Sequence, residues 1–171
     1  MAGLIDELMD TLDKQNDGYQ ELLVLAKQKT GIIVKGDIEA LQKITEQEQL
    51  LVDKVAPLEK KRIEYTKDIA NVINRPLETL TITRMMELME GQPAVKARLS
   101  ELHDRLHDTV HELSRTNDLN QSLLKEALEL VNFDITLINS MKQAPLTANY
   151  DRSASSTEQH YMGRGAFDAR Q

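Results

Sequence analysis

A single run of apolar residues between Val95 and Met141 constrains the fold of this chain more than any other feature of its sequence. Apolar side chains recur there at alternating steps of three and four residues, which places them on one face of an α-helix with 3.6 residues per turn. Pro93 suits the first turn of such a helix, and Pro145 ends it because proline cannot donate to the helical hydrogen-bond ladder. The spacing therefore predicts one helix over residues 93–143, about 75 Å long at 1.5 Å per residue.

Two further helical stripes precede this one and predict helices over residues 2–35 and 37–75. Between them, Gly36 suits the left-handed residue that follows a helix, and Asp37 suits the N-cap of the next. Helices joined by so short a turn pack antiparallel.

The second of these stripes follows the steps of three and four that are typical of a coiled coil. Glu48 and Arg62 are its polar members, and we interpret them as register-setting residues or as side chains that reach out to solvent at the end of the seam. Pro57 lies inside the stripe and predicts a bend in the helix.

The connector over residues 76–92 breaks the helical rhythm. An extended segment over residues 79–83 leads to a short helix over residues 84–90, with Thr83 as its N-cap and Gly91 after its end. We interpret the methionines of this segment as a flexible plug across the end of a bundle, with a binding surface as the alternative. They are Met85, Met86 and Met89.

These elements predict an all-α fold: an elongated antiparallel bundle or coiled coil of three long helices and one short connecting helix, over residues 1–143. Aromatic residues are only 4% of the chain and tryptophan is absent, which suits a helical bundle better than a sheet protein. Residues 144–171 have no apolar period and are rich in turn and linker residues, so a flexible C-terminal tail is expected there.

The C-terminal quarter of the long helix is the expected interaction site. The predicted helix exceeds its antiparallel neighbour, so roughly 15–20 Å of it should extend beyond the hairpin. Apolar residues there occupy more than one face, which a helix covered on one side does not need. Asn117 and Asn120 interrupt the stripe just before, either to fix register or to mark where internal packing gives way to a partner.

Composition excludes several other classes. A net charge of −7 argues against a nucleic-acid binder, which needs a basic face. No window reaches about 18 uncharged apolar residues, so no membrane insertion is expected. The N-terminus lacks the basic region and apolar run of a signal peptide, and the absence of cysteine removes disulfides and thiolate chemistry. We therefore expect a cytoplasmic protein.

Three histidines at helical spacing, His103, His107 and His111, are the strongest candidates for chemistry. A spacing of four residues can hold zinc or nickel, and a helical histidine phosphotransfer domain also presents one histidine on a face. Neighbouring acidic residues instead make this stripe typical of a solvated face, and nothing singles out one histidine. We expect no enzyme, no metal and no cofactor.

Four segments follow one another in a characteristic order. They are the hairpin LLVLAKQKTGIIVKGDIEALQKITEQEQLLVDKVAPLEKKR, the connector LTIT, the segment LNQSLLKEALELVNFDI and the tail YMGRGAFDARQ. Together they resemble the FlgN family of flagellar type III export chaperones over nearly the whole chain. The resemblance implies a cytoplasmic chaperone that prevents aggregation of hook-associated proteins 1 and 3, the two hook–filament junction proteins, and delivers them to the export apparatus.

In this family the C-terminal part of the long helix carries the client site. By position, the residues expected to bind the client are Asn120, Leu123, Leu124, Leu128, Val131, Phe133, Ile135, Leu137 and Ile138. Delivery to the export gate or its ATPase needs a second contact. Its candidates are Tyr150, Tyr161 and Phe167, for which intramolecular or lattice packing is the alternative.

A protein of another class fits the same pattern. A structural coiled-coil scaffold would self-associate through the same exposed stripe, whereas a chaperone would be a monomer or a weak homodimer.

Overall fold

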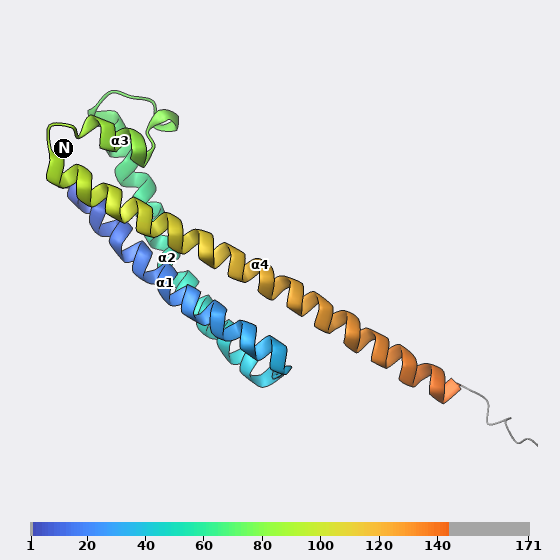
Figure 1. Cartoon of the computed structure of the whole chain (residues 1–171). Coiled ribbons are helices and arrows are strands. Elements are labelled where there is room, and N and C mark those ends of the chain that lie inside the picture. The colour runs from blue at the N-terminus through green and yellow to red at the C-terminus, as the bar shows by residue number, and fades with distance from the viewer. Residues whose placement is uncertain (1, 144–171) are drawn as a thin grey trace, which may run out of the picture. The chain divides into compact units, whose positions relative to one another are not determined.

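The computed structural model describes residues 2–143, and within that range it contains helices and no strand. In chain order these are α1 (Ala2–Lys35), α2 (Ile38–Val72), the short 3₁₀ turn η1 (Leu77–Thr79), α3 (Ile82–Leu88) and α4 (Pro93–Gln143) (Figure 1). The prediction of an all-α fold with long helices and one short connecting helix is confirmed. The candidates Tyr150, Tyr161 and Phe167 lie outside the described residues.

The chain divides into two compact units, Met1–Asn132 and Phe133–Gln171. The first unit holds α1, α2, η1, α3 and the larger part of α4. Of the second unit, the structure describes the end of α4, residues 133–143, and every side chain in that stretch is exposed.

The turn between α1 and α2 is built as the sequence predicts. Gly36 adopts a left-handed φ of 69°, and the amides of Gly36 and Asp37 donate to the carbonyls of Ile33 and Ile32, at 3.0 and 3.3 Å. This pair of bonds satisfies carbonyls that the end of α1 would otherwise leave without a partner. Asp37 then caps α2 by accepting a hydrogen bond from the backbone amide of Ala40 at 2.9 Å.

Gly18 lets α1 and α2 approach closely. A Cβ atom at this position would lie 2.5 Å from Cγ2 of Val55, which is buried in the contact between the two helices. Valine is stiff at χ1 and cannot swing away. The conformational cost of a glycine inside α1 is therefore offset by the packing that it permits.

The connector differs from the sequence prediction at three points. Thr81, not Thr83, caps the short helix: its Oγ1 accepts from the amide of Arg84 at 3.1 Å, whereas Thr83 lies within the first turn. The predicted extended segment over residues 79–83 is shorter, because the 3₁₀ turn η1 reaches Thr79 and α3 begins at Ile82, with extended backbone at Thr81 between them. α2 ends at Val72, because Asn74 takes a left-handed φ of 53°, which asparagine tolerates as glycine does.

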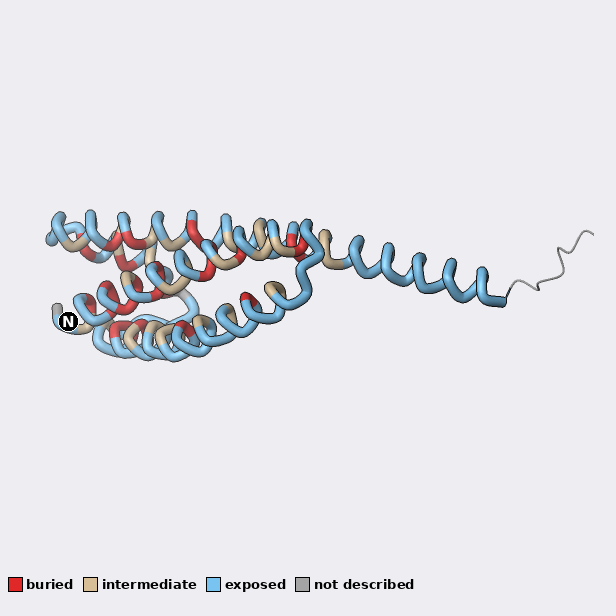
Figure 2. The backbone as a smooth tube through the Cα atoms, turned by 90° about the horizontal axis from the view of Figure 1, so that it is seen from below, coloured by how far each residue is buried: buried red, intermediate tan, exposed pale blue. Residues whose placement is uncertain are grey.

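The hydrophobic core of the first unit lies where α3 packs across the ends of the longer helices (Figures 1 and 2). Its buried members are Ile5, Leu8, Met9 and Leu12 of α1, Ile69 and Ala70 of α2, Leu80 of the connector, Met85 and Met89 of α3, and Leu99 and Leu102 of α4. Two of the three connector methionines thus serve as the plug that we expected, and the bundle is closed at this end.

Candidate functional site

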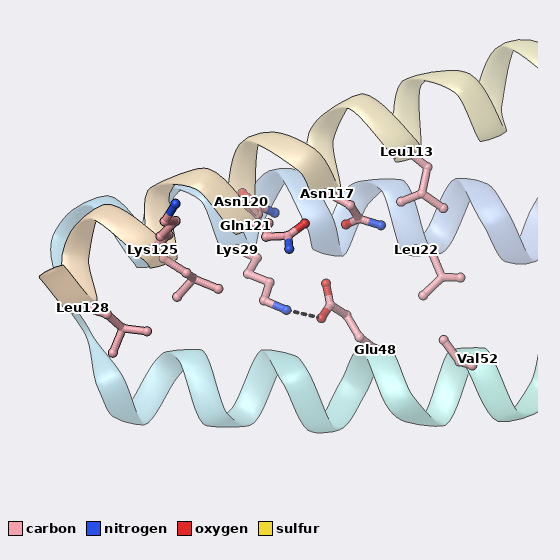
Figure 3. Close-up of a pocket in the computed structure, with 11 residues that line it drawn as sticks. Leu22, Lys29, Glu48, Val52, Leu113, Asn117, Asn120, Gln121, Lys125 and Leu128 are labelled. Carbon is pink, nitrogen blue, oxygen red and sulfur yellow. Dashed lines mark hydrogen bonds and ion pairs between the residues drawn. The ribbon is translucent and has the colours of Figure 1, made fainter.

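The opposite part of the first unit, toward the α1–α2 turn, contains an open groove of about 730 Å³ that we name the hairpin groove. Figure 3 shows α4 on one side of it and α2 on the other, with α1 behind. Its lining residues are Leu22 and Lys29 of α1, Glu48 and Val52 of α2, and Leu113, Asn117, Asn120, Gln121, Leu124, Lys125 and Leu128 of α4.

Polar side chains along both walls explain why the groove stays open. α4 presents Asn117, Gln121 and Lys125, all exposed, and α2 presents Glu48. Closing the walls on one another would take these groups out of water, which costs free energy unless each finds a partner. The walls formed by α2 and α4 therefore remain apart. In this arrangement the apolar seam of α2 packs on α1, and the polar side chains of α4 stay hydrated.

α4 is instead fastened to α1 by hydrogen bonds between buried polar groups. Asn120 is only 3% exposed; its Nδ2 donates to the carbonyl of Ala26 at 2.8 Å, and its Oδ1 accepts from Thr30 Oγ1 at 2.6 Å. Further along, Thr109 of α4 lies 3.2 Å from the side chain of Asn16. These bonds support the interpretation of Asn120 as a register-setting residue, since its polar atoms are used inside the bundle.

An ion pair crosses the floor of the groove from α1 to α2. Lys29 Nζ lies 2.7 Å from Glu48 Oε2, and the two side chains are only 18% and 17% exposed. This contact supports the interpretation of Glu48 as a residue that sets the register of α2 against α1. Arg62, the other polar member of that seam, pairs with Glu59 on its own helix.

The expected client-binding residues divide into three groups. Asn120 is buried, Leu123 and Leu124 are half-buried, and Leu128 and Val131 are exposed. Leu124 and Leu128 line the hairpin groove together with Asn120. The remaining four residues, Phe133, Ile135, Leu137 and Ile138, lie in the second unit and are exposed.

Sequence reasoning did not assign Leu22, Val52 and Leu113 to the site, and these residues complete the apolar lining of the groove. Val52 falls outside the coiled-coil seam of α2, and Leu22 reads as an ordinary member of the α1 stripe. No signal along the chain could have joined them, because the groove depends on how far α2 and α4 stand apart.

The histidine stripe lies on α4 outside the hairpin groove. The rings of His103 and His107 stack with centroids 6.3 Å apart, and those of His107 and His111 with centroids 6.2 Å apart. His103 and His107 each contact the aspartate that follows them in sequence. Within residues 2–143, no group of three or more histidine, cysteine or acidic side chains is arranged to hold a metal ion.

In the part of the chain that the structure describes, none of the helices combines the length and the apolar character needed to span a membrane.

The fold and the groove define an all-helical bundle with an open groove between α2 and α4. The family comparison identifies the bundle: the model of the FlgN protein family matches residues 1–158, so the chain belongs to the FlgN family. This is a family of flagellar export chaperones, not of enzymes, and its members bind flagellar export substrates. The match confirms the resemblance seen in the sequence.

A curated relative is similar to the chain over most of its length. The chain is 23% identical over 137 residues to the uncharacterized protein YvyG of Bacillus subtilis (strain 168), which covers 80% of this chain and 79% of the relative. No solved structure is a significant match to the chain.

Proposed function

We propose that this protein is a cytoplasmic chaperone for hook-associated proteins 1 and 3, which it holds until they are delivered to the flagellar type III export apparatus. Family membership supports the general role. The observation that carries the proposal is the exposure of large apolar side chains along the end of α4. They are Leu128, Leu130, Val131, Phe133, Ile135, Leu137, Ile138 and Met141.

The distribution of these side chains around α4 supports binding on more than one side. At 100° per residue they do not gather on a single stripe, whereas a surface helix packed on one neighbour needs only one. Phe133 is 64% exposed and Ile135 51% exposed. Covering each such side chain is worth roughly 1–2 kcal/mol at these exposures, before the cost of ordering the partner is subtracted.

The proposed mode of binding is helix against helix. The client terminus folds as an amphipathic helix whose apolar residues, spaced by three and four, contact Leu123, Leu124, Leu128 and Val131 in the first unit, and Phe133, Ile135, Leu137 and Ile138 in the second. Asn120 positions α4 for this contact through its bonds to α1. For delivery, we propose that Tyr150, Tyr161 and Phe167 contact the export gate or its ATPase.

Calorimetric titration with the C-terminal segments of hook-associated proteins 1 and 3 tests the proposal. We expect the wild-type protein to bind, and Leu124→Asp and Ile135→Asp each to weaken binding at least tenfold, because a charge is placed in an apolar contact. Val34→Asp is the matched control, since Val34 is 71% exposed, lies at the end of α1 and is not part of the groove. Circular dichroism checks that all variants keep their helicity. Equal binding by all variants, or none by a folded wild-type protein, would contradict the proposal.

A self-associating scaffold is the second candidate, and one observation favours it. Val24 and Leu50 are exposed beside Leu25 and Leu51 in a second shallow groove between α1 and α2. Light scattering at micromolar concentration separates the two functions: a chaperone is a monomer or a weak dimer, whereas a scaffold is a tight oligomer at every concentration tested.

A further inference from the structure

The hairpin groove has a polar centre between two apolar ends. Figure 3 shows the Lys29–Glu48 pair in the middle, with Leu22, Leu113 and Val52 to one side and Leu128 to the other. An amphipathic helix lying along the groove would cover all three parts at once.

The ion pair does not use all of its hydrogen-bonding capacity. The Lys29 ammonium has three donors, and within the described residues 2–143 its hydrogen-bond partner is Glu48 Oε2. Within residues 2–143, Glu48 Oε1 accepts no hydrogen bond. In the free protein water reaches these atoms, because the groove is open.

A uniformly apolar helix would remove that water and leave charged donors and acceptors unsatisfied, which is far more costly than losing a neutral hydrogen bond. A charged residue on the helix would bury an uncompensated net charge, because the pair itself is neutral. An amide or hydroxyl can donate to Glu48 and accept from Lys29 without adding charge.

We propose that the Lys29–Glu48 pair is the specificity-determining element of the groove, an inference that rests on the proposed chaperone function. It selects a client helix that carries one uncharged hydrogen-bonding residue, asparagine, glutamine, serine or threonine, within an otherwise apolar face. Apolar residues lie one to two turns away on both sides of that residue, opposite the Leu22 and Val52 end and the Leu128 end. The pair thereby fixes the register of the client, as a single buried asparagine does in a coiled coil.

The test is a set of titrations with two variants of the protein. In Lys29→Met/Glu48→Leu the centre of the groove becomes apolar, and in Lys29→Gln/Glu48→Gln it stays polar but loses its charges. The probes are the C-terminal segments of hook-associated proteins 1 and 3, each as the parent sequence and as single substitutions to leucine at every asparagine, glutamine, serine and threonine. Circular dichroism confirms that both protein variants remain helical.

We expect one leucine substitution in a segment to weaken binding to the wild-type protein by about tenfold to a hundredfold, the effect of losing a hydrogen bond to a charged group. The same substitution should leave binding to Lys29→Met/Glu48→Leu unchanged or make it tighter, while Lys29→Gln/Glu48→Gln keeps the wild-type preference.

Two outcomes would overturn the inference. In one, the leucine substitutions in the segments change binding to the wild-type protein and to Lys29→Met/Glu48→Leu by the same factor. That outcome overturns the role of the ion pair but not the proposed chaperone function. The other is a groove occupied by a second copy of the chain. The protein would then be a dimer at the titration concentration, and Leu124→Asp would convert this dimer to monomers. Failure of the proposed function looks different, because no parent segment then binds any form of the protein.

Discussion

Two glycines of α1 show how one residue type meets opposite demands within one helix. Gly18 faces Val55 at a distance that leaves no room for a methyl group, whereas a Cβ atom at Gly31 would meet nothing within 4 Å. Both sit inside α1 with ordinary helical backbone. The sequence presents both as simple interruptions of a helix, and only the packing distinguishes them.

We predict that Gly18→Ala destabilises the protein by about 1–2 kcal/mol, because overpacking outweighs the gain in helix propensity. Gly31→Ala should stabilise it by about 0.5–1 kcal/mol, since only the propensity changes. Urea unfolding followed by circular dichroism measures both. Stabilisation by both substitutions would mean that α1 and α2 do not approach closely at Gly18.

A polar cluster beside this contact gives the stability of the protein a dependence on pH. Arg62 and, to a lesser degree, Gln15 donate hydrogen bonds to Glu59, and the bond from Arg62 is the main reason why the pKa of the Glu59 carboxyl lies below its ordinary value. Because the pKa of Glu59 is lower in the folded state, the ionised carboxylate stabilises the fold at any pH above its unfolded-state pKa of about 4.3. This stabilisation is lost as the pH falls through the lowered folded-state pKa.

We therefore expect Glu59→Gln to lower the free energy of unfolding at pH 7 by less than about 1 kcal/mol, since the side chain is 42% exposed and solvent screens the pair. The difference from wild type should shrink as the pH falls below about 4. Glu39→Gln removes a far more exposed partner of Lys43 and should show almost no difference at either pH. A Glu59→Gln effect that grows in acid would contradict the assignment.

At the scale of the element, a buried amide of α4 contributes to its position on α1, together with the Thr109–Asn16 bond and the core. Asn117 and Asn120 look alike in the sequence, but Asn117 is exposed on the groove and Asn120 bridges Ala26 and Thr30. We predict that Asn120→Ala lowers the free energy of unfolding by about 1–3 kcal/mol, because it removes two hydrogen bonds between α4 and α1. Asn117→Ala should be neutral or slightly stabilising because alanine favours helix. Thermal unfolding of the two variants measures both changes. Equal changes in stability would contradict the different roles of Asn117 and Asn120.

The ends of the helices could be predicted from the sequence wherever a local side chain decides them. The turn at Gly36 and Asp37 depends only on the conformation and capping of those two residues, and the start of α4 depends only on Pro93 in its first turn. Both boundaries were therefore predictable. The N-cap of α3 was not, because Thr81 and Thr83 are chemically identical and only the path of the connector places one of them at the helix start.

The candidate site could be predicted only in part, for a similar reason. The apolar excess at the end of α4 is visible along the chain, since it depends on composition and helical period alone. The hairpin groove depends on the separation of α2 from α4, which the α3 plug, the Asn120 bonds and the Lys29–Glu48 pair set together. None of these contacts is local in sequence.

At the scale of the first unit, stability is concentrated where α3 closes the bundle. Leu8, Leu12, Ile69 and Leu99 are among its largest fully buried side chains, and all belong to the core at that end. In hydrogen–deuterium exchange we expect the amides of residues 5–12 to be protected more strongly than those of residues 22–35, because the second stretch buries fewer apolar side chains per helical turn and therefore opens more easily.

Addition of a binding client segment should selectively raise protection of residues 22–35, since a ligand that binds only the closed form opposes opening. Uniform protection along α1 in the free protein would contradict this gradient.

Some residues that line the groove, such as Asn120 and Leu22, also hold the bundle together, whereas others are exposed and take no part in its core. Positions such as Val52 and Leu128 can therefore accept substitution with little thermodynamic penalty, whereas changes at the α3 end cannot. For protein engineering, a library restricted to exposed wall positions such as Val52 and Leu128 changes the chemistry of the groove and leaves the buried packing at the α3 end unchanged.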